Sequence, residues 1–383
     1  MNVESWSMDG KRIGLIGASC RAMAASLVAG GTSVAVADMF ADFDTCRIAE
    51  ATPLKRYPWS APAWLGKASV DAWCYTGGLE NYPRLISRMS RACPLLGNQA
   101  ETLRQVRDPF RLAEWARKHD FQFPEVARDA SSDSSGRWLL KPLRSAGGLN
   151  IQHSTSADFS SCRFYRQRFA DGVPMSISVL STPDQWQLVG ACQLHVGSDW
   201  GTPTEFLFAG ATTLPLARLE ALPELEAIVA ALHQESGLLG LWGIDVVMAD
   251  GPIVLEVNPR WTATMPLYER NLATRLMPRH IAACGDATFD RLPTSANGTS
   301  GLRILYAQRP VRCTAEHLTE LSARFDLSTE ASLAQPSIAD IPNVGTEIEV
   351  GHPICSLYAD GADEAEVERS LADQVTAVQR ILQ

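Results

Sequence analysis

Residues 243–260 read GIDVVMADGPIVLEVNPR, and this stretch decides the fold expected for its surroundings. Two apolar runs flank Asp250-Gly251, a dipeptide that favours a tight hairpin turn. With a two-residue turn there, Ala249 faces Pro252, Val247 faces Val254, and Asp245 faces Glu256. Because side chains alternate along a strand, one face would carry the core residues Ile244, Val246, Met248, Ile253, Leu255 and Val257. The other face would carry Asp245, Glu256 and Asn258.

The polar face of this hairpin predicts a metal site. Opposed side chains on paired strands have Cβ atoms about 5 Å apart, and like charges so placed are destabilising. A divalent cation offsets that repulsion, and two acids with one amide are ligands that suit Mg²⁺ beside phosphates. Arg260 follows at once and adds a fork of donors. The alternative is a solvated sheet face with unrelated polar side chains.

Two segments upstream carry further candidate residues. Residues 138–148 read WLLKPLRSAGG, in which Lys141 closes an expected strand before a glycine-containing loop. Such a lysine can bind phosphate, and backbone N–H groups of the loop can add donors. Residues 164–176 read FYRQRFADGVPMS and predict a strand, a turn and a second strand. Taken singly, each segment is equally compatible with an ordinary surface hairpin.

The chain before this region predicts a parallel α/β unit. Residues 12–38 read as strand, helix and strand, the pattern of a βαβ unit. The glycines of this unit do not form G-x-G-x-x-G, so the dinucleotide fingerprint is weak. Asp38 stands where a ribose-binding acid would stand, but a solvated strand end is the favoured interpretation. Residues 72–75 predict a further short strand, followed by a loop at 77–81 and a helix from Pro83.

The middle and the end of the chain are expected to contain many short strands and a few helices, unlike the parallel unit before them. After the polar stretch 129–137, short strands are expected at 138–141, 162–169, 175–180, 186–192, 243–248 and 253–257. A helix face is marked by Leu225, Ile228, Val229 and Leu232. A polar joint at 293–301 precedes a strand at 302–306 and a final helix with Val367, Leu371, Val375, Val378 and Leu382 on one face. A central domain of antiparallel sheet and helices is predicted.

Composition excludes several classes of protein. With 34 Lys and Arg against 43 Asp and Glu, the net charge of −9 argues against a general nucleic-acid binder. The nine cysteines include no C-x-x-C pair, so zinc and thioredoxin-like motifs are not expected. No apolar run has the length of a signal peptide or of a membrane helix. We expect a reduced cytoplasmic protein with no membrane partner.

In their order and spacing, the Lys141 segment, the 164–176 segment and the Asp245–Arg260 hairpin resemble the ATP-grasp superfamily. The resemblance covers residues 100–270, and the tail at 340–353 is similar to the closing segment of the carboxylate–amine ligase branch. The chain is also loosely similar to tyramine–glutamate ligase-like proteins of one-carbon coenzyme biosynthesis. The fold class implied is a multidomain α/β and α+β protein. Its parts would be an N-terminal parallel α/β domain at 1–100, an ATP-grasp domain at 101–292 and a small C-terminal α+β segment at 293–383.

The resemblance implies a role for each matching position. Lys141 would contact the phosphates of ATP, and Arg260 would stabilise the transferred phosphoryl group and the acyl-phosphate. A lid over the phosphates would consist of Ser145, Ala146, Gly147 and Gly148. The adenine would be lined by Gln167, Arg168, Phe169 and Ala170. The Mg²⁺ ligands would be Asp245, Glu256 and Asn258.

Two positions depart from the family pattern. Many members have a lysine early in the helix after the N-terminal domain, near Pro109 here, where this chain has none. Arg107 or Arg111 would substitute for it, or the contact is absent. Arg168 stands where a carboxylate is common, which leaves the contacts to adenine and ribose open.

Three functions are compatible with this resemblance. The first is an ADP-forming ligase that activates a carboxylate as an acyl-phosphate and joins it to an amine in cofactor biosynthesis. The second is an ATP-dependent carboxylase that uses bicarbonate, and the third is a non-catalytic nucleotide-binding protein on the same fold. The expected partners are a small carboxylate and an amine, together with ATP and Mg²⁺. A homodimer, the identity of the acid and that of the amine are left open by the sequence.

Overall fold

The computed structural model describes residues 10–128, 136–154, 163–215, 223–285, 289–293 and 298–383. Three parts of the sequence predictions therefore lie outside the described residues: most of the polar stretch 129–137, the first residue of the strand at 162–169 and residues 294–297 of the polar joint. The described chain has the fold class that the sequence predicts, with a parallel sheet followed by antiparallel sheets and helices.

The N-terminal part is a four-stranded parallel sheet in the order β3-β2-β1-β4. Its strands are β1 (Arg12–Ile16), β2 (Ser33–Asp38), β3 (Glu50–Pro53) and β4 (Ala72–Tyr75). The helices of this part are α1 (Arg21–Val28), α2 (Phe43–Ile48), α3 (Ala61–Leu65), the 3₁₀ turn η1 (Leu79–Asn81) and α4 (Pro83–Ser90). Ile13, Val36 and Cys74 are buried, as expected for parallel strands covered on both faces. The predicted βαβ opening is confirmed, but the expectation of a solvated Asp38 was wrong: its side chain is buried and accepts hydrogen bonds from backbone N–H groups at Cys20, Phe40 and Ala41.

Two helices connect this unit to the rest of the chain. Helix α5 (Ala100–Val106) ends just before Arg107, and α6 (Pro109–His119) begins two residues later. The side chain of Asp108 accepts a hydrogen bond from the backbone N–H of Phe110 and so caps α6. Pro109 is suited to the first turn because its missing N–H would have no helical partner there. The break between α5 and α6 places Arg107 at a helix junction.

A small antiparallel sheet follows in the order β5-β8-β6-β7. Its strands are β5 (Val126–Ala127), β6 (Trp138–Pro142), β7 (Gln152–His153) and β8 (Phe164–Arg168). Lys141 is paired with Tyr165, and Leu139 is paired with Gln167. Because alternate residues share a face of the sheet, Lys141 and Gln167 lie on the same side.

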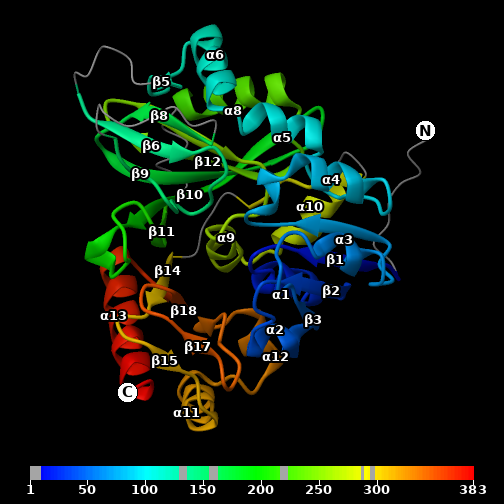
Figure 1. Ribbon diagram of the computed structural model, residues 1–383, viewed down its shortest axis with the longest axis vertical. Helices are drawn as coiled ribbons and strands as arrows, with labels where there is room; N and C mark the ends of the chain where they lie inside the picture. The colour runs from blue at the N-terminus through cyan, green and yellow to red at the C-terminus, as the bar shows by residue number, and fades with distance from the viewer. Residues whose placement is uncertain (1–9, 129–135, 155–162, 216–222, 286–288, 294–297) are drawn as a thin grey trace.

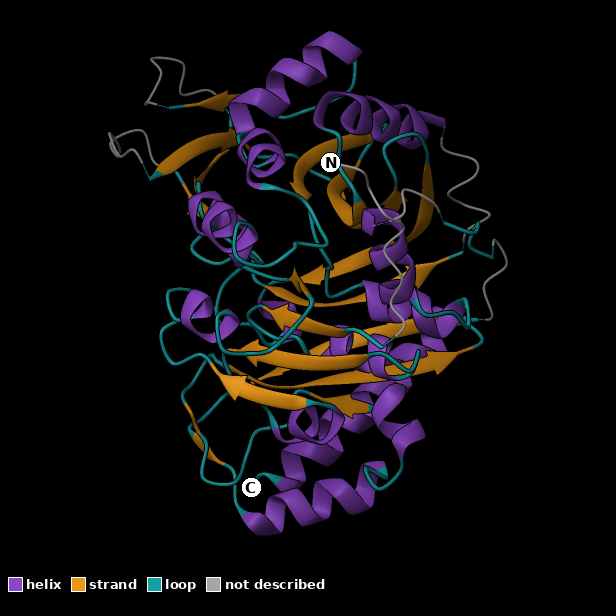
Figure 2. Ribbon diagram, turned by 90° about the vertical axis from the view of Figure 1, so that its right-hand side faces the viewer, coloured by secondary structure: helices purple, strands orange, loops and turns teal. Residues whose placement is uncertain are grey.

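A sheet of eight strands forms the centre of the molecule, in the order β13-β12-β9-β10-β11-β14-β18-β16 (Figure 2). Its strands are β9 (Val173–Ser181), β10 (Trp186–Val196), β11 (Phe208–Leu214), β12 (Gly240–Met248), β13 (Pro252–Asn258), β14 (Thr299–Tyr306), β16 (Ile338–Ala339) and β18 (Pro353–Gly361). A separate ribbon pairs β15 (Val311–Arg312) with β17 (Glu347–Ile348). The central sheet therefore runs without interruption across the division predicted after residue 292.

The remaining helices cover the central sheet and its ends (Figure 1). They are η2 (Ser198–Trp200), α8 (Pro223–Ser236), α9 (Met265–Asn271), α10 (Leu276–Gly285), α11 (Ala315–Phe325), α12 (Glu330–Ala334) and α13 (Glu364–Ile381). The predicted apolar face of α8 is buried with Ile177, Trp242 and Ile244 of the sheet. Val367, Leu371 and Val378 of α13 are buried in the core that it shares with β14 and β18. Both predicted helix faces are thus confirmed.

The hairpin of β12 and β13 differs from its prediction near the turn. Asp245 does pair with Glu256, as predicted, but a bulge between Asp245 and Val246 shifts the rest of the register. Val247 therefore pairs with Ile253 instead of Val254. As a result Val254 is fully buried, whereas Leu255 lines the cavity described below. The prediction that Ile253 and Leu255 belong to the core face was wrong because a bulge adds one residue to one strand.

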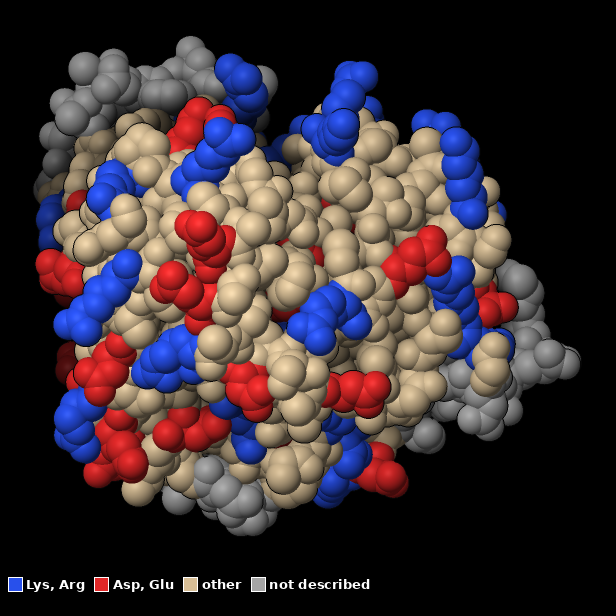
Figure 3. Space-filling view, turned by 90° about the horizontal axis from the view of Figure 1, so that it is seen from below, with Lys and Arg blue, Asp and Glu red and all other residues tan. Residues whose placement is uncertain are grey.

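Two further features bear on the class of protein. No helix among the described residues is long and apolar enough to cross a membrane. Lys and Arg side chains are interspersed with Asp and Glu on the face shown in Figure 3. That face therefore offers no extended basic surface of the kind that binds nucleic acid.

Candidate active site

A cavity of about 680 Å³ lies between the small sheet, the central sheet and the N-terminal unit. Predicted site residues from all three segments, 138–148, 164–176 and 243–260, line this cavity. They are Lys141, Gly147, Gly148, Gln167, Arg168, Phe169, Ala170, Asp245, Glu256, Asn258 and Arg260. Ser145 and Ala146 line an adjoining pocket together with Arg107. The structure thus brings every predicted site residue to the cavity or to its edge.

The polar face of the β12–β13 hairpin carries a tightly packed set of oxygens. Asp245 lies opposite Glu256, and the amide nitrogen of Asn258 donates to Asp245 Oδ2 over 2.8 Å. Burial and the neighbouring charge of Glu256 raise the pKa of Asp245 above its ordinary value. Burial acts against ionisation of Glu256 as well, but Arg107 and Lys141 more than offset it, so the pKa of Glu256 is lowered. Glu256 is therefore stabilised as a carboxylate by its cationic neighbours, whereas ionisation of Asp245 beside it is disfavoured.

This donor set fits Mg²⁺. Among the described residues no three His, Cys, Asp or Glu side chains are grouped to hold a metal by themselves. Two carboxylates and one amide remain, and the amide is Asn258, which lies beside Asp245. Hard oxygen ligands that keep open positions for phosphate oxygens are what Mg²⁺ prefers. The carboxylates of Asp245 and Glu256 lie opposite each other on paired strands, so a cation between them would offset their repulsion.

Arg260 is fixed on one side of the cavity by a buried carboxylate. Its Nε donates to Glu80 Oε1 over 2.8 Å, and its Nη2 donates to Asn258 Oδ1 over 3.2 Å. The side chain of Glu80 is fully buried, and that of Arg260 is 10% exposed. Although burial disfavours the charge, Glu80 and the acids of the hairpin raise the pKa of Arg260. The guanidinium therefore stays charged next to the predicted metal ligands.

Lys141 presents a buried ammonium group from the end of β6. Its Nζ donates to Gln167 Oε1 over 2.9 Å, and Gln167 in turn donates weakly to the carbonyl of Leu255. A single neutral partner does not satisfy three donors. Lys141 thus retains donors for an anion inside the cavity.

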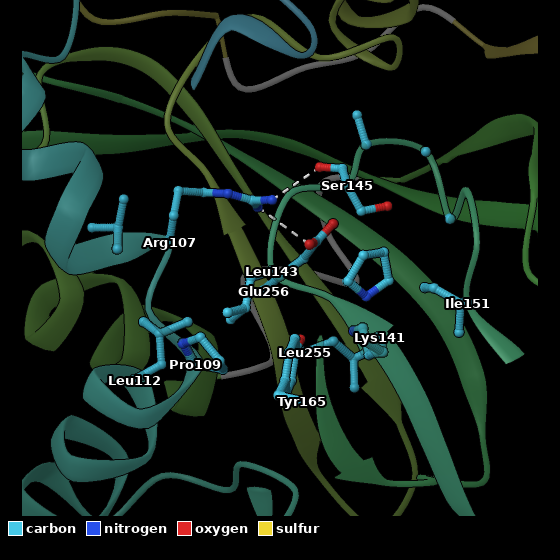
Figure 4. A pocket seen from close by; sticks show the side chains of 15 residues that line it. Arg107, Pro109, Leu112, Lys141, Leu143, Ser145, Ile151, Tyr165, Leu255 and Glu256 are labelled. Carbon is cyan, nitrogen blue, oxygen red and sulfur yellow. Dashed lines mark hydrogen bonds and ion pairs between the residues drawn. The ribbon is translucent and has the colours of Figure 1, made fainter. Parts of the chain in front are cut away.

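Arg107 points into the predicted site, toward Glu256 and the glycine loop (Figure 4). Its Nη1 donates to Glu256 Oε2 over 3.2 Å, and its Nη2 donates to the carbonyl of Ser145 over 3.0 Å. Arg111 instead pairs with Glu114, and both of those side chains are more than half exposed. Of the two arginines left open by the sequence, Arg107 is the one that the structure places in the site.

The glycine loop is held against the central sheet. Gly147 and Gly148 have φ of +64° and +82°, which an L side chain rarely adopts. The carbonyl of Gly147 accepts a hydrogen bond from the backbone N–H of Phe208 over 3.0 Å. A Cβ on residue 148 would collide with the backbone carbonyl of Phe206. Only glycine therefore permits this close approach of loop and strand.

Arg168 differs from the family pattern, and the structure shows how its charge is used. Its guanidinium pairs with Glu125 and lies 5.0 Å from the ring centroid of Trp138. Phe169 forms part of the cavity wall next to it, and its ring centroid lies 6.4 Å from that of Phe206. An aromatic wall of this kind can pack on a purine base. The charge of Arg168 is thus paired with Glu125, the residue just before strand β5, which is the neighbour of β8.

The far end of the cavity contains residues that sequence reasoning missed. They come from the N-terminal unit, from the loop after β13 and from the C-terminal strands, and include Ser19, Arg21, Thr262, Thr264, Asp340, Ser356 and Tyr358. Asp340 accepts hydrogen bonds from Ser19 Oγ over 2.9 Å and from Ser356 Oγ over 2.6 Å. The similarity of the tail at 340–353 to a family closing segment was the one available signal for Asp340.

Comparison with solved structures establishes the class of fold. A biotin carboxylase of Campylobacter jejuni, described as a complex with β,γ-ATP, superposes with a TM-score of 0.72 at 11% identity, covering 94% of this chain and 89% of that one. A carboxyaminoimidazole ribonucleotide synthase of Aspergillus clavatus, complexed with ATP, gives 0.68 at 15% identity, covering 98% and 100%. An L-amino acid ligase of Bacillus licheniformis gives 0.68 at 12% identity, covering 96% and 97%. The chain has the ATP-grasp fold over nearly its whole length.

Comparison with protein families identifies the domain itself. Residues 106–264 match the ATP-grasp domain. No curated protein matches the chain. The chain therefore contains an ATP-grasp domain at residues 106–264, and solved structures that share its fold include a carboxylase and a ligase.

Proposed function

We propose that this chain is an ADP-forming ligase that activates a small carboxylate as an acyl-phosphate and joins it to an amine. The observation that carries the proposal is one cavity that holds metal-ligand oxygens, cationic side chains and a glycine loop. The far end of the same cavity leaves room for substrates beside the nucleotide. Each part is what the reaction requires, and their proximity supports the assignment.

The chemistry follows from the weakness of a carboxylate as an acyl donor, because its leaving group would be oxide. The carboxylate attacks the γ-phosphate of ATP, which releases ADP and gives an acyl-phosphate. An amine then attacks the acyl carbon and displaces phosphate. Phosphoryl transfer depends on positioning and on neutralising charge. When bound, Mg²⁺ would neutralise phosphate charge next to Asp245, Glu256 and Asn258. Lys141 and Arg260 would hold the transferred group and the acyl-phosphate.

The far end of the cavity supports an amine as the second substrate. Asp340 lines this end, and burial together with the charge of Asp44 raises its pKa. A cationic ammonium group would offset the negative charge of such a buried carboxylate. Tyr358 and Leu302 add an apolar surface for the body of a small organic molecule. Adenine would lie at the other end, near Gln167 and Phe169.

The test is an ATP-dependent screen of acids against amines, read by ADP formation and by product mass. We expect ADP release that requires both an acid and an amine, with a product whose mass is their sum less water. In Lys141→Met, turnover should fall by at least about a hundredfold, because a buried phosphate donor is lost. Lys118→Met is the matched control, since Lys118 is exposed and pairs with Glu235 far from the cavity.

The two alternative functions give different results in the same assay. ADP release that depends on bicarbonate alone would identify a carboxylase in place of a carboxylate–amine ligase. Tight binding of Mg-ATP without turnover across the whole panel would identify a non-catalytic nucleotide-binding protein. Either result would contradict the ligase proposal.

A further inference from the structure

The 3₁₀ turn η1 contacts both the reactive centre and the glycine loop, although it belongs to the N-terminal unit. Glu80 of this turn forms the buried pair with Arg260. The next residue, Asn81, donates from Nδ2 to the carbonyl of Ser145 over 3.2 Å. Tyr82 then lies beneath Arg144 of the loop, whose guanidinium is 5.5 Å from the ring centroid. Successive residues thus contact two parts of the site that are far apart in the sequence.

The contact of Glu80 with Arg260 controls orientation. A guanidinium is planar, with its donors in a rigid fork, so fixing Nε fixes the plane of the whole group. The remaining nitrogens then donate to the carbonyl of Trp261 over 3.0 Å and to Asn258 Oδ1 over 3.2 Å. Asn258 belongs to the predicted metal face, so the plane of Arg260 is matched to that face.

The same pair is poorly arranged for stability. Glu80 Oε2 is buried and makes no hydrogen bond with the part of the chain that the structure describes. Leaving a buried carboxylate oxygen unpaired costs free energy. Buried ion pairs are often no more stable than apolar residues of similar volume. The geometry is therefore better explained by placement of Arg260 than by stabilisation of the fold.

We propose that Glu80 is a positioning residue for Arg260, and that turn η1 couples the orientation of this arginine to closure of the glycine loop. The inference rests on the proposed function, in which Arg260 meets the transferred phosphoryl group. The path of coupling runs from Arg260 through Glu80 and Asn81 to the carbonyl of Ser145. Arg107 strengthens it by donating to the same carbonyl and to Asn81 Oδ1.

Two variants separate charge from position. Glu80→Gln keeps the size and one acceptor oxygen but leaves Arg260 without a charged partner. Glu80→Asp keeps the charge, which protects folding, but shortens the side chain by one methylene. We expect kcat to fall about tenfold or more in both variants, because catalytic geometry tolerates little displacement. KM for Mg-ATP should change less than kcat, because Lys141 is intact and Arg107 still holds the loop through the carbonyl of Ser145.

The matched control is Glu269→Gln. Glu269 is another buried glutamate paired with an arginine, Arg275, but it does not line the cavity. The Glu269→Gln substitution should lower the unfolding temperature without lowering kcat of the folded protein. If Glu80 had only a structural role, Glu80→Asp would also have a lower unfolding temperature and an unchanged kcat. A wild-type kcat in Glu80→Asp would therefore overturn the positioning role.

Hydrogen exchange tests the coupling independently of any reaction. In the absence of nucleotide, backbone amides at 143–149 should exchange faster in Glu80→Gln than in the wild type, and at wild-type rates in Glu269→Gln. Unchanged exchange in Glu80→Gln would contradict the coupling. Absence of ligase turnover in the wild type would contradict the proposed function alone, because the exchange measurement would still decide whether η1 holds the loop.

Discussion

Arg107 joins the predicted metal face to the glycine loop through one guanidinium group. It contacts Glu256 and the carbonyls of Val257 and Ser145. In Arg107→Ala we expect the affinity for Mg-ATP to fall by about ten- to a hundredfold, because hydrogen bonds to a charged group are lost and the loop loses its anchor. Titration with a fluorescent ATP analogue would measure this. Arg111→Ala, which removes an exposed arginine, should bind as the wild type, and equal losses in both variants would contradict the assignment.

Asp245 carries a charge that burial and the neighbouring Glu256 disfavour in the absence of a metal. Its pKa is raised, so ionisation opposes folding, and this penalty disappears as the pH falls through the raised value. Asp245→Asn keeps an acceptor for Asn258 and should therefore leave the unfolding free energy without metal equal or higher. Turnover with Mg-ATP should fall by about a hundredfold or more. Melting without metal, combined with ADP release, tests both effects, and a less stable variant would refute the first.

At this scale, the sequence predicted what polarity and turn chemistry encode. The Asp-Gly turn and the alternation of side chains place Asp245 opposite Glu256, and the structure confirms this pairing. The bulge that turns Leu255 toward the cavity depends on backbone geometry that apolar periodicity does not reveal. The choice between Arg107 and Arg111 depends on the break between α5 and α6, which only packing decides.

The glycine loop is the element whose backbone conformation the nucleotide site depends on most directly. In Gly148→Ala the new Cβ meets the carbonyl of Phe206, so the loop must leave the central sheet. In Gly147→Ala no atom lies within 4 Å of the new Cβ, and only the positive φ is unfavourable, by about 1 kcal/mol. We therefore expect KM for Mg-ATP to rise much more in Gly148→Ala. Similar KM values for the two variants would show that the docked loop is not the binding conformation.

The sequence predicted which segments form helices and strands better than it predicted which strands are neighbours in the sheet. The apolar faces of α8 and α13 are visible in the sequence because burial imposes helical periodicity. The neighbours of β11, which are β10 and β14, could not be predicted. Strand β14 begins 91 residues after the first residue of β11, and no local pattern specifies such a pairing.

At the scale of the molecule, a cluster of acids lies where the N-terminal unit meets the C-terminal strands. Burial, followed by the charges of Asp340, Asp44 and Asp38, raises the pKa of Asp42 to about 9. The folded state then holds a proton that the unfolded state releases above about pH 4. Stability should accordingly fall as the pH rises toward 9, with a slope on the order of 1 kcal/mol per pH unit from this group.

Asp42→Asn should abolish this part of the pH dependence. The variant is expected to be more stable than the wild type, by a margin that grows between about pH 5 and the raised pKa. Denaturant unfolding at several pH values would measure the margin. Asp373→Asn, at an exposed position of α13, should keep the wild-type slope. Parallel pH profiles for Asp42→Asn and the wild type would contradict the prediction.

The uninterrupted central sheet also limits how this chain could be recombined with its relatives. A graft that exchanged everything after residue 292 would replace β14, β18 and β16 as one block. The incoming block would have to match β11 in register, since Gly210 pairs with Arg303 and Thr212 with Gly301. A mismatch would leave an open strand edge, which invites association with other chains. The proposed substrate end of the cavity therefore cannot be exchanged without also exchanging strands of the sheet. Variants designed to change specificity should replace individual side chains that line the cavity.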